Sequence, residues 1–272
     1  MSNGHVYGWV PDLPDKRDNS FLYQPGITGA HKPKAMPPTV DLRTTGFLPP
    51  IFDQGNLGSC TANALTELFF FVNNKQTGTA FLPSRLFIYY NERLMEGTTS
   101  SDSGAALRDG IKSLLEQGAC VEYLWPYDIT LFANPPPNIC YADAQRHEGI
   151  YYRSIPQNSA AMMGCLAEGY PFVGGISVYD SFESPEVATS GIVPMPDLNV
   201  ETMQGGHALL FIGYLTFNGV DYYIGMNSWS ADWGMNGFFY IPRAYLEDPG
   251  LASDFWMIHV VSTPTLTLSG TQ

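Results

Sequence analysis

Helix-like and strand-like patterns occupy different parts of this sequence. Between residues 59 and 118 apolar residues recur every three or four positions, which predicts buried helices over 59–74, 83–95 and 103–118. After residue 148 the apolar runs are short and rich in aromatic and β-branched side chains, which favours strands. The chain is therefore expected to build a mainly helical part first and a mainly β part second.

Breaks in these patterns divide the chain into three parts. Residues 1–48 are rich in proline, glycine and charge and have no sustained period, which predicts an irregular N-terminal segment. The proline cluster in ANPPPNICYADAQRHEG, residues 133–149, can continue neither a helix nor a strand. We therefore expect a helical lobe over 49–147 and a β lobe over 148–272, with one further helix at 159–169.

The β part contains a specific hairpin signal. Strands are expected at 171–179, 206–217, 221–229, 237–242 and 255–262. Asn218 and Gly219 lie between two of them, and this dipeptide suits a two-residue turn that requires positive φ. Counting back from the turn pairs Leu210 with Asn227. His207 and Asn227 would then face opposite sides of the sheet unless a bulge, at Gly213 or Gly225, intervenes.

One cysteine stands at the start of the first predicted helix. Cys60 follows the glycine-rich stretch DQGNLGS, and Ser59 is the expected N-cap. A lone cysteine is usually a small buried hydrophobic residue. At a helix N-terminus, however, the unpaired N–H groups and the macrodipole favour the thiolate, which is the nucleophilic form. Cys60 is therefore a candidate nucleophile, whereas Cys120, Cys140 and Cys165 are interpreted as buried thiols.

A cysteine nucleophile needs a base, and one histidine fits that role best. His5 and His31 lie in the irregular segment, His147 in the polar linker and His259 in a terminal strand, which leaves His207. An imidazole can hold the thiol proton and later deliver it to a leaving group. Asn227 would orient the ring, and Gln54, with the Cys60 backbone N–H, would stabilise an oxyanion.

These residues lie in motifs of a known family. DQGNLGSC, GGHALLFIGY and MNSWSADWGMNGFFYI, in that order, with WPYD after EQGAC, resemble the papain-like cysteine peptidases of short-leader bacterial and viral type. The resemblance runs from Val40 to Ile258. It implies an α+β fold with a helical left lobe, an antiparallel β-barrel right lobe and an active site in the cleft between them.

The resemblance also assigns roles to individual residues. Cys60 resembles the nucleophile, His207 its acid and base partner, Asn227 the orienting amide and Gln54 the oxyanion donor. The remaining assignments concern substrate binding: Trp229 would cover the Asn–His hydrogen bond, Trp233 would line the leaving-group side, Ala208 would form a pocket wall, Asp254 would stand at the pocket floor, and Gly58 and Gly104 would hold substrate backbone.

The implied function is that of a cysteine endopeptidase acting through a thiolate–imidazolium pair and an acyl-enzyme. Two alternatives remain open: the same chemistry could serve an isopeptidase or acyltransferase, or the chain could be a catalytically inactive peptide-binding protein. A carboxylate at a pocket base can pair with a guanidinium, so Asp254 would allow a basic side chain at the main pocket alongside hydrophobic ones; alternatively, it is a solvated loop carboxylate. Residues 1–48 could cover the cleft and restrain activity, or pack permanently as a strap.

Charge and residue spacing limit the partners. The formal net charge of −13 disfavours nucleic acid and anionic membranes. The resemblance implies a peptide or protein substrate, and we expect a monomeric chain. The histidines are scattered and no Cys/His pair has ligand spacing, which predicts no metal and no cofactor.

The start of the sequence lacks the pattern of a secretory signal, so we expect a cytoplasmic protein or export without a classical signal peptide.

Overall fold

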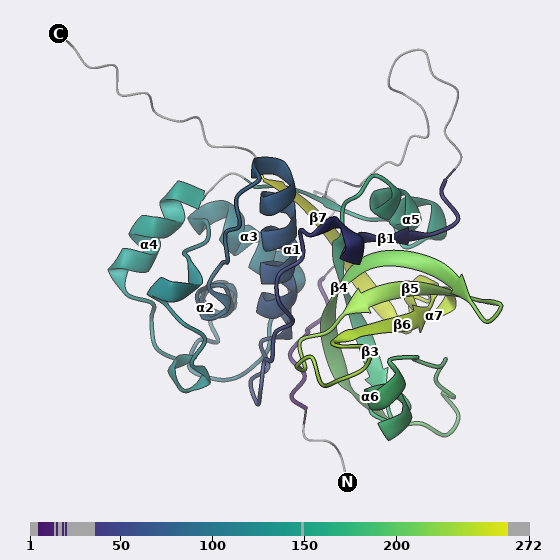
Figure 1. Cartoon of the computed structure of the whole chain (residues 1–272). Helices are drawn as coiled ribbons and strands as arrows, with labels where there is room; N and C mark the ends of the chain where they lie inside the picture. The colour runs from purple at the N-terminus through teal and green to yellow at the C-terminus, as the bar shows by residue number, and fades with distance from the viewer. Residues whose placement is uncertain are drawn as a thin grey trace, which may run out of the picture.

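Helices and a sheet form two lobes that lie side by side (Figure 1). The computed structural model describes residues 5–13, 15, 18, 20, 36–147 and 150–260. The helical lobe contains α1 (Cys60–Thr77), α2 (Arg85–Glu96), α3 (Leu107–Gln117), α4 (Asn138–Ala144) and the 3-10 helices η2 (Glu122–Leu124), η3 (Ile129–Leu131) and η4 (Gln145–His147). The three predicted helices are confirmed. Helix α4 was not predicted: Pro137 stands immediately before it, where a missing N–H does not interrupt helical bonding.

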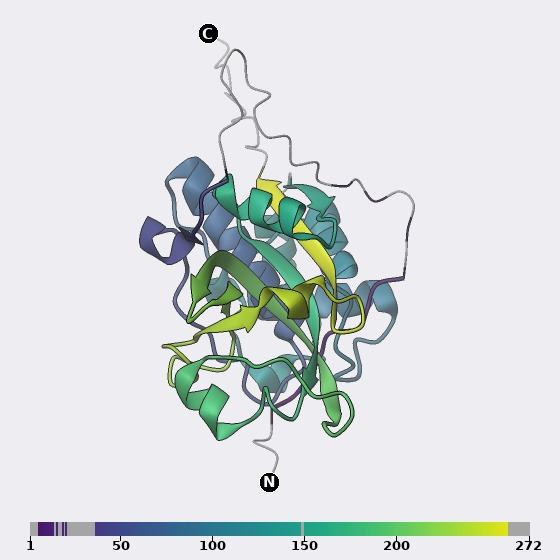
Figure 2. The same cartoon turned by 90° about the vertical axis from the view of Figure 1, so that its right-hand side faces the viewer.

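The second lobe is an antiparallel sheet. Its strand order is β2-β7-β3-β4-β5-β6, and β1 pairs with β4 off this path. The strands are β1 (Val40–Asp41), β2 (Ile150–Ser154), β3 (Phe172–Tyr179), β4 (Met203–Phe217), β5 (Val220–Met226), β6 (Phe238–Pro242) and β7 (Ala252–Val260). The other elements beside the sheet are η1 (Leu42–Thr45), α5 (Ser159–Ala167), α6 (Pro185–Ser190) and α7 (Arg243–Glu247). Figure 2 shows how strongly the sheet is twisted.

The predicted division into a helical and an antiparallel lobe is therefore confirmed. All five predicted strands and the helix at 159–169 are present, whereas β1 and β2 were not predicted. The ends of the sheet, β2 and β6, do not pair with each other in the part of the chain that the structure describes. None of the described helices is long and apolar enough to cross a membrane.

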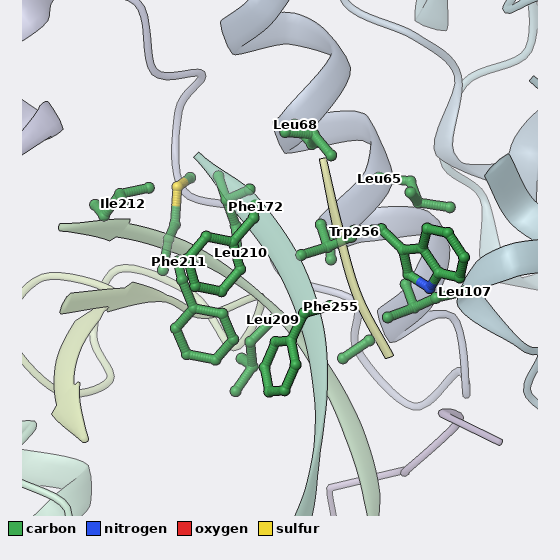
Figure 3. Close-up of a cluster of buried hydrophobic side chains, with 14 of the residues drawn as sticks. Leu65, Leu68, Leu107, Phe172, Leu209, Leu210, Phe211, Ile212, Phe255 and Trp256 are labelled. Atoms are coloured by element: carbon green, nitrogen blue, oxygen red, sulfur yellow. The ribbon is translucent and has the colours of Figure 1, made fainter. Parts of the chain in front are cut away.

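Helix α1 lies between the lobes and contacts both. It packs against α2 and α3 on one side and against β4 and β7 on the other. Figure 3 shows Leu65 and Leu68 of α1 near Leu210 of β4 and Trp256 of β7, and all four side chains are buried. Burying each of such side chains contributes roughly 1.5–3 kcal/mol. This packing fixes the position of the helix and therefore of its first residue, Cys60.

The β4–β5 hairpin contains the bulge that the sequence required. Asn218 and Gly219 form the turn with φ values of 50° and 79°. The register shifts between Phe211 and Gly213, so that Leu210 pairs with Met226 and not with Asn227. The extra residue on β4 changes which face each later position occupies. The prediction of a bulge at Gly213 is thus confirmed, and it allows His207 to meet Asn227.

Candidate active site

Cys60 is the first residue of α1 and is completely buried. The turn before it uses Gly55, whose φ of 59° favours glycine. Ser59 is the N-cap residue as predicted, but its hydroxyl does not cap the helix. It lies 2.5 Å from the Tyr127 hydroxyl and accepts from Asn63 Nδ2 at 3.1 Å. Cys60 is therefore held where a helix begins, with the side chain of the cap engaged elsewhere.

His207 and Asn227 meet across the β4–β5 pair. The distance between His207 Nε2 and Asn227 Oδ1 is 2.8 Å, and both residues are fully buried. Among the described residues, His207 Nδ1 has no hydrogen-bond partner. The backbone N–H of Ala208, the next residue, donates toward the Cys60 sulfur. This contact brings the His207 segment to the thiol, with Nδ1 as the ring nitrogen still available to it.

An indole stacks on the imidazole of His207. The ring centroids of Trp229 and His207 are 4.8 Å apart with an interplanar angle of 21°. Trp233 meets Trp229 edge to face at 5.5 Å and stacks on Phe182 at 5.7 Å. Trp229 thus lies where the resemblance placed it, over the histidine. Trp233, expected to line the leaving-group side, is buried and packs as a support for Trp229.

Gln54 is anchored by two segments near the thiol. Its Oε1 accepts from the Ser228 hydroxyl at 2.7 Å, and its backbone N–H donates to the Ser228 carbonyl at 2.9 Å. Its Nε2 donates to the carbonyl oxygens of Leu57 at 2.9 Å and Val6 at 3.0 Å. The amide predicted to bind an oxyanion is therefore occupied by a backbone carbonyl from the N-terminus of the same chain.

Residues 5–13, which we call the N-terminal segment, run between the two lobes (Figure 1). Trp9 N donates to Gly206 O at 3.0 Å in the sheet, and Val10 N donates to Ala105 O at 3.0 Å in the helical lobe. Ala105 N donates to Gly8 O at 2.7 Å, which makes a parallel bridge between Trp9 and Ala105. The segment is thus bound through its backbone on both sides.

Gly8 passes closest to the thiol. Its N–H donates toward the Cys60 sulfur. A Cβ added at Gly8 would lie 1.7 Å from Gly58 O, and one added at Gly104 would lie 2.0 Å from Gly8 O. Gly58 and Gly104, both predicted to hold substrate backbone, therefore lie against the N-terminal segment. A Cβ at Gly8 or Gly104 would therefore overlap backbone atoms, whereas one at Gly58 would meet a carboxylate oxygen of Asp102 at 3.0 Å.

The Trp9 side chain fills a pocket in the sheet lobe. A Cβ at Gly175 would lie 1.9 Å from its indole ring, and one at Gly206 would lie 2.7 Å from it. Asp254 Oδ2 accepts from Trp9 Nε1 at 3.1 Å, so the carboxylate stands at the end of the pocket that Trp9 fills, and its role toward a substrate side chain stays a prediction. The pocket wall is formed by the two glycines; Ala208, predicted as a wall, pairs with Gly175 and directs its N–H to Cys60.

A second carboxylate lies beside Asp254. Asp12 N donates to Asp254 Oδ2 at 2.8 Å, and Asp12 accepts from Trp256 Nε1 at 3.0 Å and from Arg108 N at 3.2 Å. The Arg108 guanidinium binds Asp18 at 2.7 Å. Burial and the neighbouring Asp254 raise the pKa of Asp12 to about 7, although Arg108 opposes this shift. The far end of the N-terminal segment is therefore held through Asp12, whose N–H donates to Asp254 and whose carboxyl group accepts from Trp256 and Arg108.

Burial opposes charge on both Cys60 and His207 in this covered arrangement. It raises the pKa of the Cys60 thiol to about 11, despite N–H groups from Ala208, Gly8 and Thr61 that favour the thiolate. It also lowers the pKa of His207 to about 4, against the opposing effect of Asn227. Both shifts favour the neutral thiol and the neutral imidazole, so the thiolate–imidazolium pair stays a prediction for the uncovered site.

Sequence reasoning missed the residues that the N-terminal segment contacts. Gly175 was not singled out, although it belongs to a glycine pair in a predicted strand and such pairs allow close approach. Glu183, in the loop after β3, accepts from His5 and Tyr7. His5, set aside as part of an irregular segment, stacks on Trp229 at 3.8 Å.

The remaining cysteines and histidines lie elsewhere. Cys120, Cys140 and Cys165 are free and buried, as predicted. His147 stacks on Phe81 and His259 contacts Tyr170, whereas His31 lies outside the described residues. No group of three or more His, Cys, Asp or Glu residues in the described ranges is arranged to hold a metal ion.

Comparisons with known proteins agree with this geometry. A family model described as papain family cysteine protease matches residues 36–258. The chain is 39% identical over 279 residues to an uncharacterised peptidase C1-like protein of Acanthamoeba polyphaga mimivirus, covering 96% of this chain and 88% of that protein. It is 25% identical over 241 residues to the probable cysteine protease RD21C of Arabidopsis thaliana, covering 86% of this chain but only 48% of that protein.

A solved structure shows the same fold over nearly the whole chain. The crystal structure of xylellain, a cysteine protease from Xylella fastidiosa, superposes with a TM-score of 0.83 at 39% sequence identity. The match covers 96% of this chain and 98% of that one.

Proposed function

This chain belongs to the papain family of cysteine proteases, and from that premise we propose that it is a cysteine endopeptidase that acts through Cys60 and His207. The observation that carries the proposal is the His207–Asn227 hydrogen bond of 2.8 Å, which leaves Nδ1 of the ring without a hydrogen-bond partner among the described residues, while the next residue, Ala208, directs its N–H to the thiol at the start of α1. Metal and cofactor chemistry are not needed for this reaction.

Each of these residues has a separate role in the proposed reaction. His207 Nδ1 takes the thiol proton, and the Cys60 sulfur attacks the carbonyl carbon of the scissile bond. Gln54 Nε2 and the Cys60 backbone N–H donate to the oxyanion that forms. His207 then protonates the leaving amine as the C–N bond breaks, which leaves an acyl-enzyme. Water, deprotonated by His207, releases the acid and restores the thiol.

The experiment that tests this function is digestion of a peptide library by the full chain and by Cys60→Ser. We expect cleaved peptides with the first enzyme and none with the second. Addition of a primary amine would reveal an acyltransferase, because the acyl group would then appear on the amine and not in the free acid. Cleavage by Cys60→Ser at the original rate would contradict the proposal.

We further propose that the N-terminal segment is a built-in inhibitor. It occupies Gln54 with the Val6 carbonyl and fills the Asp254 pocket with Trp9. It is not cut because the group presented to the Cys60 sulfur is the Gly8 N–H, whereas attack requires a carbonyl carbon there. Removing this cover would return Cys60 and His207 to water, where their ion pair is no longer penalised by burial.

We expect inhibition to weaken as the pH rises from about 4 to about 7. A free aspartate has a pKa near 3.9, whereas Asp12 in the bound segment has a pKa of about 7, so binding takes up a proton between these values. Each pH unit in this window weakens binding by up to about tenfold, and the effect levels off above the bound pKa. When the segment is released, the proton of the Cys60 thiol moves to His207. The total number of protons on the two residues does not change as long as the uncovered pair is an ion pair, so they contribute no net proton uptake.

The measurement is the initial rate of peptide cleavage by the full chain, divided at each pH by the rate of a variant whose segment is released. Asp12→Asn removes the titrating group and keeps its shape, so this ratio should lose most of its rise between pH 4 and 7. A rise of the same size in Asp12→Asn would show that another group controls release.

Asp254 should select the side chain bound in the Trp9 pocket. Its Oδ2 accepts the indole N–H of Trp9, and a guanidinium could take the same place with an opposite charge. In Asp254→Ala we expect the preference for Arg over Leu at the residue two before the scissile bond to fall by roughly tenfold, the effect of losing one charge-assisted hydrogen bond. This preference is measured as the ratio of kcat/KM for the Arg and Leu peptides. An unchanged ratio in Asp254→Ala would contradict the role proposed for Asp254.

A further inference from the structure

A second subsite lies on the other side of Cys60 from the Trp9 pocket. Along the N-terminal segment, Trp9 marks the pocket side and Gly8 lies at the thiol. His5 and Tyr7 lie beyond the thiol, where both donate to Glu183: His5 Nδ1 is 2.9 Å from Oε2, and the Tyr7 hydroxyl donates to Oε1. In the proposed endopeptidase the pocket side binds the acyl part of the substrate. The side with Glu183 therefore receives the leaving group, and the inference rests on that function.

The subsite combines a flat aromatic face with a carboxylate. The His5 ring lies parallel to the Trp229 indole at 3.8 Å with an interplanar angle of 2°. An indole face also attracts a planar cation, such as a guanidinium. Burial would raise the pKa of Glu183, but hydrogen bonds from His5 and Tyr7 outweigh it in the covered chain and hold that pKa below its usual value. Once His5 and Tyr7 leave, Glu183 is open to water, where a glutamate is also ionised at neutral pH.

The position of Glu183 is fixed by its neighbours in the loop. Phe182 is buried and packs against Trp229 and Trp233 at 5.7 Å from each ring. Ser184 caps α6 by accepting from Val187 N at 3.2 Å. The residues on either side of Glu183 are thus anchored to the same tryptophan pair and to a helix. A carboxylate held this way loses little conformational entropy when it binds a ligand, which favours specificity.

We propose that Glu183 and Trp229 form a leaving-group subsite that selects substrates with a cationic, planar side chain, arginine or protonated histidine, within two residues after the scissile bond. The N-terminal segment fills the same subsite with His5. A substrate with glutamine at this position would lack the charge interaction, and one with glutamate would be repelled by Glu183.

The test compares peptides that differ only in one residue after the scissile bond, carrying Arg, Gln or Glu at the first or the second position. The enzyme is the full chain with Gly8→Ala, which is designed to release the N-terminal segment. We expect kcat/KM for Arg to exceed that for Gln by roughly 5- to 20-fold at one of the two positions, as for a charge-assisted hydrogen bond that is partly open to water. In Glu183→Gln this ratio should fall to about one.

One control variant and the choice of readout separate this subsite from other effects. Glu186→Gln makes the same charge change three residues away at an exposed position, and it should keep the Arg-to-Gln ratio. Glu183 also favours the charged form of His207, so Glu183→Gln could slow all peptides alike; only the ratio reports selection.

Affinity gives a readout that does not need turnover. Binding of the same peptides to the chain with Cys60→Ser and Gly8→Ala should show the same preference for Arg and the same loss in Glu183→Gln. The subsite would be overturned if the enzyme that keeps Glu183 and the variant Glu183→Gln had equal Arg-to-Gln ratios, in cleavage or in this binding measurement. Absence of cleavage together with Arg-selective binding would contradict the endopeptidase function and leave the subsite standing.

Discussion

Gly8→Ala should raise the initial rate of peptide cleavage by the full chain by roughly 10- to 100-fold. The added Cβ would lie 1.7 Å from the carbonyl oxygen of Gly58, a backbone atom that cannot move aside alone. Overpacking of this kind costs about 1–3 kcal/mol, and each 1.4 kcal/mol is a factor of ten in the covering equilibrium. The gain should appear in the first turnovers, before any processing of the N-terminus.

Leu13→Ala is the matched control for this change. Leu13 belongs to the same segment, but 82% of it is exposed, so the substitution should leave the rate unchanged. If the segment were a permanent strap, Gly8→Ala would lower the melting temperature of the chain without raising its activity. That pair of results would contradict the proposal of a releasable inhibitor.

Cys60→Ser should abolish cleavage, with a loss in kcat on the order of 10⁴- to 10⁶-fold, as expected when the nucleophile of a cooperating group is removed. A serine hydroxyl at this position has no partner that makes it an anion. The variant should be assayed together with Gly8→Ala, so that inhibition by the segment does not mask the residual rate.

Cys140→Ser provides the control for losing a buried thiol. The Cys140 sulfur donates to the Leu124 carbonyl at 3.8 Å and lies, with Cys120, in a separate small cluster of buried side chains. Its substitution should cost stability but not the chemical step. Equal losses of activity in Cys140→Ser and Cys60→Ser would show that folding, not the nucleophile, had been tested.

The residues of the proposed reaction could be predicted because their signals are local. A cysteine at a helix start, an Asn-Gly turn and the strand pattern around His207 each follow from short-range rules. The hairpin count even required a bulge, and the register shift between Phe211 and Gly213 supplies it. Trp229 was found through the family motif, since no periodicity in the sequence assigns an indole to a histidine ring.

The contacts of the N-terminal segment could not be predicted in the same way. They are made largely by backbone groups of Val6, Gly8 and Trp9, which carry no signal in residue type. The pocket for Trp9 is defined by side chains that are missing, at Gly175 and Gly206. The charge states of Cys60 and His207 depend on that cover. Burial under the cover disfavours both charged forms, an effect that the helix start alone does not indicate.

The most direct measurement is the rate at which an epoxide thiol reagent labels each cysteine of the native chain, followed by peptide mapping. We expect slow labelling of Cys60 in the full chain. In Gly8→Ala its labelling should be at least roughly tenfold faster, because release of the segment restores the reactive ion pair. Cys60→Ser should show no labelling at position 60. Equal labelling rates with and without Gly8→Ala, or faster labelling of Cys120, Cys140 or Cys165 than of Cys60, would contradict this account.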